Sequence, residues 1–311
     1  MGNNRVSIVH HLLKLVILLG FTGYLVYLAL TGEILLFIAP HLVKYVEIAA
    51  AGLFLFCIFQ LYFSIRSLKQ PDAAHDCDHG HCHHHDLEHG HSHEPSRSLW
   101  KNVMIYGLFI LPLLFGLFLP NQAFAGSLAR NKGMNVGGEA VTSDGVPLDL
   151  AQLVGNEDAA IKQLFRSDKY NRDYAKLGML LYQQDLIEMK DEWFIEKLQA
   201  LHSFADQFEG KQIKIKGFIY RENELSENQF IIGRMAMTHC IADISPYGIV
   251  TESPDASSYA NDTWVTITGT IEKTTYHNQT VIKIIVENVE PATAPVIPYV
   301  YPDWGFAQKL Q

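Results

Sequence analysis

The sequence is poor in cysteine and has no excess of positive charge. Its four cysteines among 311 residues are too few and too scattered for a disulfide framework, which excludes the class of small secreted domains held together by disulfides. It contains 24 Lys and Arg against 33 Asp and Glu, a formal net charge of −9. A basic footprint is therefore absent, and we exclude nucleic acid as a partner.

Signatures of catalysis are missing as well. We find no HExxH pattern, no glycine-rich phosphate loop and no clear nucleophile–base pair. We therefore expect that the protein is not an enzyme. The weakest alternative is a metal- or thiol-dependent membrane-anchored enzyme.

Long apolar runs, in contrast, are abundant near the amino terminus. Residues 11–30, 45–65 and 103–120 each form a run about long enough to cross a ~30 Å hydrocarbon layer. Three such runs within 120 residues favour transmembrane helices over buried core helices. Pro112 lies inside the third run, where membrane helices tolerate a kink.

The segment between the first two runs has a different character. Residues 34–39 are apolar but too few to cross, and Pro40-His41 follows, so we expect a re-entrant or interfacial piece. Glu47 then falls at or just inside the second span, either as a functional group or as a carboxylate at headgroup level. The AFA at 123–125 resembles a processing site after the third run.

Lys and Arg near the ends of the runs predict the orientation. Six flank the amino terminus and the second loop, against three on the opposite side: Arg5, Lys14, Arg66, Lys69, Arg97 and Lys101, against Lys44, Arg130 and Lys132. We expect a multi-pass bacterial cell-membrane protein whose amino terminus and loop 70–98 are cytoplasmic. Three spans then place the carboxyl-terminal domain outside the cytoplasm.

The loop 70–98 contains the stretch AHDCDHGHCHHHDLEHGHSH at residues 74–93. This stretch holds nine of the fifteen histidines, two of the four cysteines and no Lys or Arg. Neutral imidazole and thiolate suit zinc and other soft divalent ions better than magnesium or calcium. The candidate ligands are His75, Cys77, His79, His81, Cys82, His83, His84, His85, His89, His91 and His93.

The spacing of these ligands is loose and matches no ordered zinc finger. Gly80 and Gly90 favour flexibility, and only Leu87 could contribute to a core. We therefore predict a chelating strand with many overlapping zinc sites and not one built site. The alternative is a solvated polar loop with no metal role.

The remainder predicts a linker at residues 121–145 and a soluble domain at 146–311. We expect helices over 156–165, capped by Asn156, and over 191–210, ending at Gly210, with a hairpin over 179–189 between them. Five strands are expected at 211–220, 229–235, 240–244, 264–272 and 281–290. The predicted fold class is an α+β membrane protein with three transmembrane helices and a soluble OB-like small β-barrel with a few helices, with Gly217 and Gly269 at bends.

A candidate site in this domain is the block RMAMTHCIAD, residues 234–243. His239, Cys240 and Asp243 could hold a metal ion if the backbone bulges or turns, because adjacent strand residues point to opposite faces. Alternatively, Cys240 is a buried small side chain, His239 has a satisfied hydrogen bond, and Arg234 with Asp243 forms a structural ion pair.

Several segments resemble the YcgQ-like family of bacterial membrane proteins, which are regarded as subunits of two-component permeases. The matching segments are GKQIKIKGFIY, NQFIIGRMAMTHCIAD, PVIPYVYP, the Pro40-His41 corner, and LFLP followed by SLARNKG. Family members typically have two adjacent cysteines where this chain has His239-Cys240, which argues against a paired-thiol redox site and is compatible with metal ligation. The resemblance implies a larger multi-span permease subunit as partner.

The leading functional hypothesis is an accessory subunit of a membrane permease in zinc-like metal transport or homeostasis. Three spans are too few for a typical secondary transporter. The loop would concentrate a cation inside the cell, and the barrel would bind an ion or the partner outside. A second hypothesis is a non-catalytic assembly protein with no direct metal role.

Overall fold

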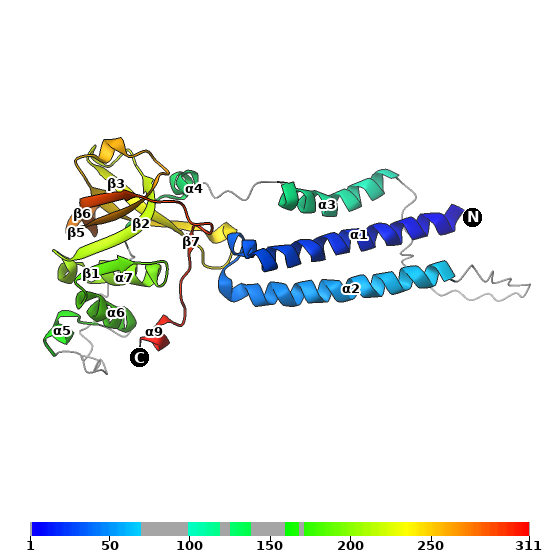
Figure 1. Cartoon of the computed structure of the whole chain (residues 1–311), viewed down its shortest axis with the longest axis horizontal. Coiled ribbons are helices and arrows are strands. Elements are labelled where there is room, and N and C mark those ends of the chain that lie inside the picture. The colour runs from blue at the N-terminus through cyan, green and yellow to red at the C-terminus, as the bar shows by residue number, and fades with distance from the viewer. Residues whose placement is uncertain (1, 70–98, 119–124, 138–158, 168–170, 311) are drawn as a thin grey trace, which may run out of the picture. The chain divides into compact units, whose positions relative to one another are not determined.

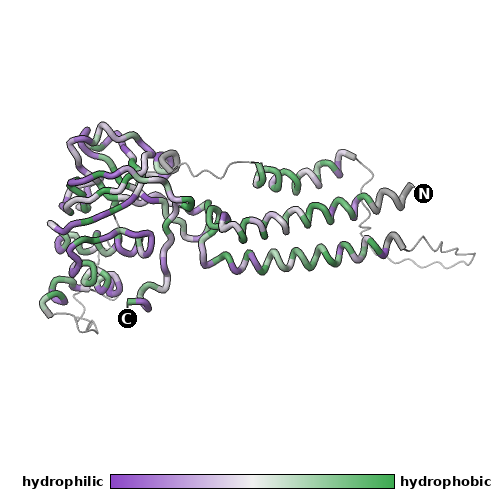
Figure 2. The backbone as a smooth tube through the Cα atoms, in the orientation of Figure 1, coloured by the Kyte–Doolittle hydropathy of each residue, from purple (hydrophilic) through white to green (hydrophobic). Residues whose placement is uncertain are grey.

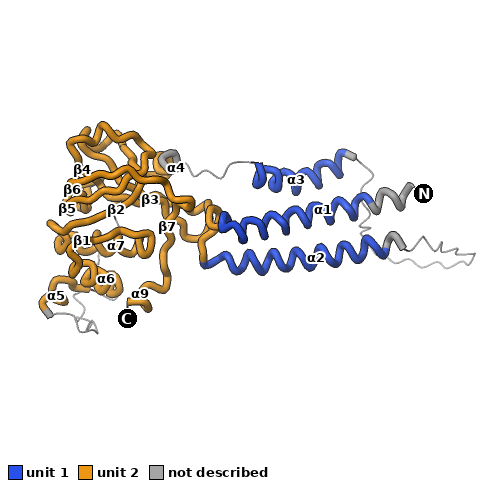
Figure 3. Tube along the Cα trace, in the orientation of Figure 1, with its two compact units in different colours: residues 1–34, 41–121 blue, residues 35–40, 122–311 orange. Residues whose placement is uncertain are grey.

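The computed structural model describes residues 2–69, 99–118, 125–137, 159–167 and 171–310 (Figure 1). The chain divides into two compact units, which are coloured separately in Figure 3. The first comprises residues 1–34 and 41–121, and the second comprises residues 35–40 and 122–311. The predicted domain boundary at residue 120 lies beside this division, but the sequence did not indicate that residues 35–40 belong to the second unit.

Three apolar helices make up the first unit: α1 (Gly2–Thr31), α2 (Val43–Lys69) and α3 (Leu99–Phe118). Segments long and apolar enough to cross a membrane are Val9–Thr31, Pro40–Arg66 and Trp100–Phe118. Apolar residues run along these helices in Figure 2, and many of their side chains are exposed. Such a surface suits lipid or another membrane-embedded chain. The three predicted spans are confirmed.

Helix α1 approaches α3 closely at two glycines. A Cβ at Gly20 would lie 2.7 Å from Leu113 Cδ2, and one at Gly116 would lie 2.8 Å from the Tyr24 ring. The Tyr24 hydroxyl donates to the Gly116 carbonyl at 3.0 Å. Small residues permit this close packing, which is the main source of helix association in a membrane.

The link from α1 to α2 contains two short 3₁₀ helices, η1 (Glu33–Leu36) and η2 (Pro40–Leu42). We expected residues 34–39 to be re-entrant or interfacial. The structure instead makes Leu35–Pro40 part of the second unit. The reason is hydrogen bonding to a turn of the soluble domain, which is described below.

The second unit is built on a seven-stranded sheet. Its strands are β1 (Leu186–Met189), β2 (Gln212–Tyr220), β3 (Gln229–Ala236), β4 (Ser245–Glu252), β5 (Trp264–Tyr276), β6 (Gln279–Pro291) and β7 (Tyr299–Val300). The order is β1-β2-β5-β6-β4-β3-β7, and β2 also pairs with β3. The five strands β2, β5, β6, β4 and β3 therefore close into a ring, so the predicted small barrel is present.

Within the ring, only the β4–β6 pair is parallel. The short strands β1 and β7 are added in parallel to β2 and β3. Gly269 lies at a register shift in the β5–β6 ladder, where a Cβ would stand 2.1 Å from the Ile285 carbonyl oxygen. Gly217 likewise leaves room for the Gly233 carbonyl oxygen, so both predicted bends need glycine.

Two groups of buried side chains stabilise the second unit. One joins the barrel strands to α6 (Arg172–Tyr182), α7 (Phe194–Ser203) and α8 (Ala205–Phe208). The other joins β2, β3 and β4 to the chain after α4 (Ala125–Lys132), with Leu36 packed against it. The alternating residues predicted to share a face on β2, Ile213, Ile215 and Ile219, are all buried.

Some predicted elements are correct and others are not. The helix predicted over 191–210 is confirmed as α7 and α8, and Gly210 ends it at φ 82°. The helix predicted over 156–165 is present as α5 (Ala159–Leu164), and its cap Asn156 lies outside the described residues. The hairpin over 179–189 is wrong: residues up to Tyr182 complete α6, whose buried Ala175 and Met179 share one helix face, and β1 pairs with β2.

A buried histidine makes this core sensitive to acid. His202 lies in α7, and its Nε2 is buried with no hydrogen-bond partner within the described part of the chain. Burial lowers the pKa of His202 from 6.5 to about 4. The folded state therefore binds this proton less well than the unfolded state. The stability that depends on His202 is complete above pH 6.5 and declines as the pH falls towards 4.

We therefore predict that His202→Gln flattens the acid limb of the unfolding curve. Between about pH 6.5 and pH 4, the native chain should lose up to about 3 kcal/mol more unfolding free energy than the variant. Urea unfolding of the detergent-solubilised full chain at several pH values measures this difference. Equal pH slopes for the two chains would show that His202 titrates normally.

Candidate functional site

The turn between β3 and β4, residues 237–244, makes many hydrogen bonds, both within itself and to other parts of the second unit. We expected a strand over 240–244, but residues Ile241–Asp243 form a 3₁₀ helix, η3, so that prediction is wrong. The physical reason is Asp243, whose carboxylate binds the backbone that precedes it. The missed strand, β4, begins directly afterwards at Ser245.

The Asp243 carboxylate gathers three successive backbone N–H groups. Thr238 donates to Oδ1 at 3.0 Å, while His239 and Cys240 donate to Oδ2 at 2.7 and 3.2 Å. Nδ1 of His239 also lies 3.2 Å from Oδ2. Burial alone would raise the pKa of Asp243, but the hydrogen bonds from Thr238, Cys240 and His239 outweigh it and hold the pKa below its usual range.

This bracing leaves one edge of the turn for a second strand of backbone. The Ala39 N–H donates to the His239 carbonyl at 2.8 Å, and the Ile241 N–H donates to the Phe37 carbonyl at 2.9 Å. Ile38 and Cys240 are thus partners in an isolated antiparallel bridge. The link between the first two membrane helices is therefore a component of the soluble domain's own structure.

Further contacts hold the same segment in place. The Tyr301 hydroxyl donates to the Leu35 carbonyl at 2.8 Å, and Leu36 packs on the second buried cluster. On the other side of the turn, Lys132 Nζ donates to the carbonyls of Ala242 and Ile244, at 3.2 and 2.7 Å. We call residues 35–40 together with 237–244 the latch.

The metal-ligating role predicted for His239, Cys240 and Asp243 gains no support from this geometry. The His239 side chain is 60% exposed and lies beside Asp243, whose carboxylate already accepts backbone N–H groups. Cys240 is in extended backbone, half-buried within the bridge. In the part of the chain that the structure describes, no three His, Cys, Asp or Glu side chains are grouped so that they could hold a metal ion. Metal binding here stays a prediction.

The other predicted ligands belong to the loop at 70–98, which lies outside the described residues. They are His75, Cys77, His79, His81, Cys82, His83, His84, His85, His89, His91 and His93.

Arg234 does not pair with Asp243, as the alternative interpretation had it. Its side chain is only 1% exposed and makes an ion pair with Asp191. The guanidinium also lies 5.7 Å from the Phe194 ring centroid and 5.4 Å from that of Trp264. Only Nη1 of Arg234 pairs with Asp191, and the aromatic rings add cation–π contacts, while Nε and Nη2 are buried with no hydrogen-bond partner among the described residues.

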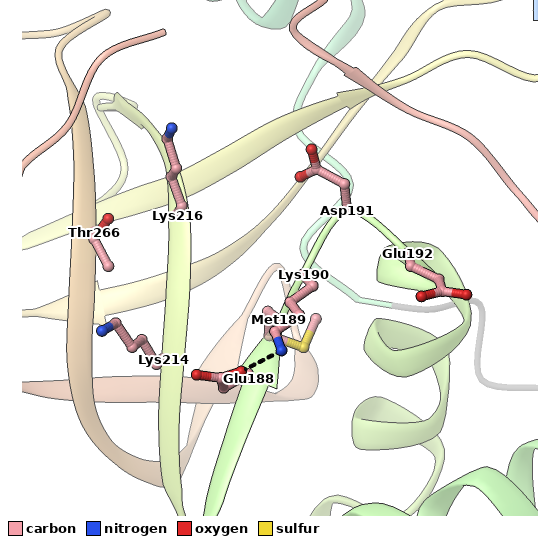
Figure 4. Close-up of a pocket in the computed structure, with 8 residues that line it drawn as sticks. All are labelled: Glu188, Met189, Lys190, Asp191, Glu192, Lys214, Lys216 and Thr266. Carbon is pink, nitrogen blue, oxygen red and sulfur yellow. Dashed lines mark ion pairs between the residues drawn. The ribbon is translucent and has the colours of Figure 1, made fainter. Parts of the chain in front are cut away.

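A shallow pocket of about 470 Å³ lies next to this ion pair (Figure 4). Three of its lining residues are basic and three are acidic: Lys190, Lys214 and Lys216, with Glu188, Asp191 and Glu192. Two of the carboxylates are already paired, Glu188 with Lys190 and Asp191 with Arg234. The balanced lining does not select an ion of one sign.

The sequence analysis missed the pairing of the latch. One signal was present: an apolar run too short to cross a membrane still has backbone groups that need partners. The residues that supply those partners, His239, Ile241 and Tyr301, lie more than 190 positions away, so periodicity could not reveal them.

Fold and latch together define a class: a three-span membrane protein whose closed barrel is joined by hydrogen bonds to its own first membrane hairpin. Comparison with known proteins specifies it further. The DUF1980 N-terminal domain matches residues 13–135, and the DUF1980 C-terminal domain matches residues 164–302. The chain belongs to this YcgQ-like family.

Two relatives match nearly end to end. The UPF0703 protein YcgQ of Bacillus subtilis is 28% identical, covering 93% of this chain and 98% of its own length. A protein of Streptococcus mutans named "Putative two-component membrane permease complex subunit" is 23% identical, covering 93% and 99%.

The latch leads to a stability prediction. Asp243→Ala removes the acceptor for three backbone N–H groups, so we expect the second unit to lose about 2–3 kcal/mol of unfolding free energy. Asp243→Asn keeps one carbonyl acceptor and should lose about half as much. Because the folded pKa of Asp243 is lowered, this stabilisation is complete above the usual carboxyl range and is lost as the pH falls below about 4.

Urea unfolding measures the stability of the second unit, and chymotrypsin cleavage after Phe37 measures whether residues 35–40 stay bound to the turn. Asp243→Ala should lower the midpoint and expose Phe37 to the protease. Glu227→Ala, a change at an exposed carboxylate, is the control and should do neither. An Asp243→Ala chain with the native midpoint and native protection at Phe37 would refute the bracing role.

Proposed function

We propose that this protein is the accessory subunit of a two-component membrane permease complex. The observation that carries the proposal is the latch, in which the segment between the first two spans makes backbone hydrogen bonds to the β3–β4 turn of the barrel. The name of the Streptococcus mutans relative supports the same assignment.

The latch also supports a three-span topology. Residues 35–40 and the barrel must lie on the same side of the membrane, because they share hydrogen bonds. A chain with spans α1, α2 and α3 meets this requirement, since the α1–α2 link and the segment after α3 then emerge on one side. The bias of Lys and Arg makes that side the extracytoplasmic one in our proposal, with the amino terminus and the loop 70–98 in the cytoplasm.

The barrel is the element we assign to binding a partner. A five-stranded closed ring with one parallel pair is consistent with an OB-like barrel. We assign its outer surface and the latch to the larger, multi-span permease subunit. We assign no catalytic role to the chain.

The metal role of the proposal depends on residues 70–98. Nine histidines and two cysteines within 20 residues are donors for zinc or a similar soft divalent ion. Such ligands must lose their protons to bind, so the affinity should fall as the pH drops through ~6.5. In this proposal the loop concentrates the cation on the cytoplasmic side, and the latch makes no direct contact with it.

A purification experiment separates the two roles. The tagged full chain, isolated from its native membrane, should carry a multi-span protein and more than one zinc per chain. Deleting residues 75–93 should remove most of the zinc and leave the partner. Ala39→Pro, which removes the N–H that donates to His239, should release the partner and leave the zinc.

Ala39→Gly is the matched control, because it keeps the backbone donor, and it should retain both. If the chain that lacks residues 75–93 loses its zinc but keeps the partner, the metal role of the loop is supported. A full chain that brings down no membrane protein would contradict the permease assignment, and unchanged zinc after the deletion would return the loop to a solvated segment.

A further inference from the structure

Two adjacent histidines near the amino end of α1 hold the other two membrane helices. His10 Nδ1 lies 2.7 Å from the Tyr106 hydroxyl on α3, and the rings stack with centroids 5.7 Å apart. His11 Nδ1 lies 2.9 Å from Nε2 of Gln60 on α2. An ionisable side chain within a membrane span is a functional candidate, and the function proposed above uses neither of these.

The hydrogen bonds of Gln60 fix the protonation state of His11. Gln60 Nε2 also donates to the His11 backbone carbonyl, at 3.4 Å. Only the NH₂ group of an amide can donate, so it is this group that faces His11, and Nδ1 must accept its other hydrogen. The proton of the neutral ring is therefore on Nε2.

Protonation affects the two histidines differently. A proton on His11 Nδ1 would turn this nitrogen into a donor facing the NH₂ group of Gln60, which is also a donor. Rotating the Gln60 amide would not relieve this, because its oxygen would then face the oxygen of the His11 carbonyl. The His10 contact survives protonation, because a tyrosine hydroxyl can accept as well as donate. The α1–α2 contact is thus sensitive to a proton, and the α1–α3 contact is not.

Among the described residues of this half of the bundle, no carboxylate is present to neutralise the added charge. On this half of the bundle the charged residues of the three helices are Arg5 and Lys14 on α1, Arg66 and Lys69 on α2, and Lys101 on α3, all of them cationic. The other titratable groups are His10, Tyr62 and Tyr106. In the described first unit the carboxylates are Glu33 and Glu47, near the opposite helix ends.

We infer that His11 and Gln60 form a proton-binding joint that loosens α2 from α1 when the imidazole is protonated. This joint is separate from the metal role proposed for the loop histidines.

Cys57 provides a local probe of this contact. It lies on α2, is 4% exposed, and its Sγ is 3.8 Å from Thr22 Oγ1 on α1. The full chain, with Cys77, Cys82 and Cys240 replaced by Ser, is reconstituted in lipid nanodiscs and labelled with N-ethylmaleimide. Comparing chains at the same pH cancels the reagent's own pH dependence.

His11→Asn keeps a neutral acceptor near the position of Nδ1. At about pH 5.5, Cys57 in the chain that retains His11 should label roughly fivefold faster than Cys57 in the His11→Asn chain. The reason is that losing one hydrogen bond between α1 and α2 shifts the equilibrium towards separated helices by about this factor. At about pH 8 the two should label equally. Gln60→Glu, which can accept from a protonated imidazole, should also prevent the loosening.

His10→Asn is the matched control. Its Cys57 should label at the same rate as in the chain that retains both histidines, at both pH values. Equal labelling of the His11 and His11→Asn chains at both pH values would overturn the inference. A His10→Asn chain that also loses the acid response would overturn the assignment to His11.

Discussion

The two backbone hydrogen bonds between Phe37–Ala39 and His239–Ile241 are the interaction on which the remaining structure depends. They join segments about 200 positions apart and make residues 35–40, between α1 and α2, part of the second unit. Because hydrogen-bonded segments share one side of a membrane, they also require an even number of spans between the α1–α2 link and the barrel, and α2 and α3 meet this requirement.

The latch works because its turn is ordered before the hairpin segment adds to it. Asp243 satisfies the N–H groups of Thr238, His239 and Cys240, and Lys132 satisfies the carbonyls on the other side. The carbonyl of His239 and the N–H of Ile241 then remain for residues 37–39. The polar backbone groups of the turn are thus paired within the chain itself.

The sequence predicted what depends on local pattern. Length and apolar character identified the three spans, and alternation identified β2, β3, β5 and β6. It failed where one residue overrode the pattern: Asp243 turns the apparent strand at 240–244 into a 3₁₀ helix, and Pro246 and Gly248 disguised β4. It could not reveal the latch or the contacts of His10 and His11, because each needs a partner far along the chain.

Disulfide formation between Ile38→Cys and the native Cys240 tests the latch most directly. The hydrogen bonds flank this pair rather than joining it, which places the two Cα atoms about 4.5 Å apart, within the range for a disulfide. With Cys57, Cys77 and Cys82 replaced by Ser, mild oxidation of membranes followed by peptide mass mapping should show the 38–240 link. Phe37→Cys, whose side chain points to the opposite face, should not form one. A reactive but unlinked Cys240 in the Ile38→Cys chain, or equal linkage from both positions, would contradict the account.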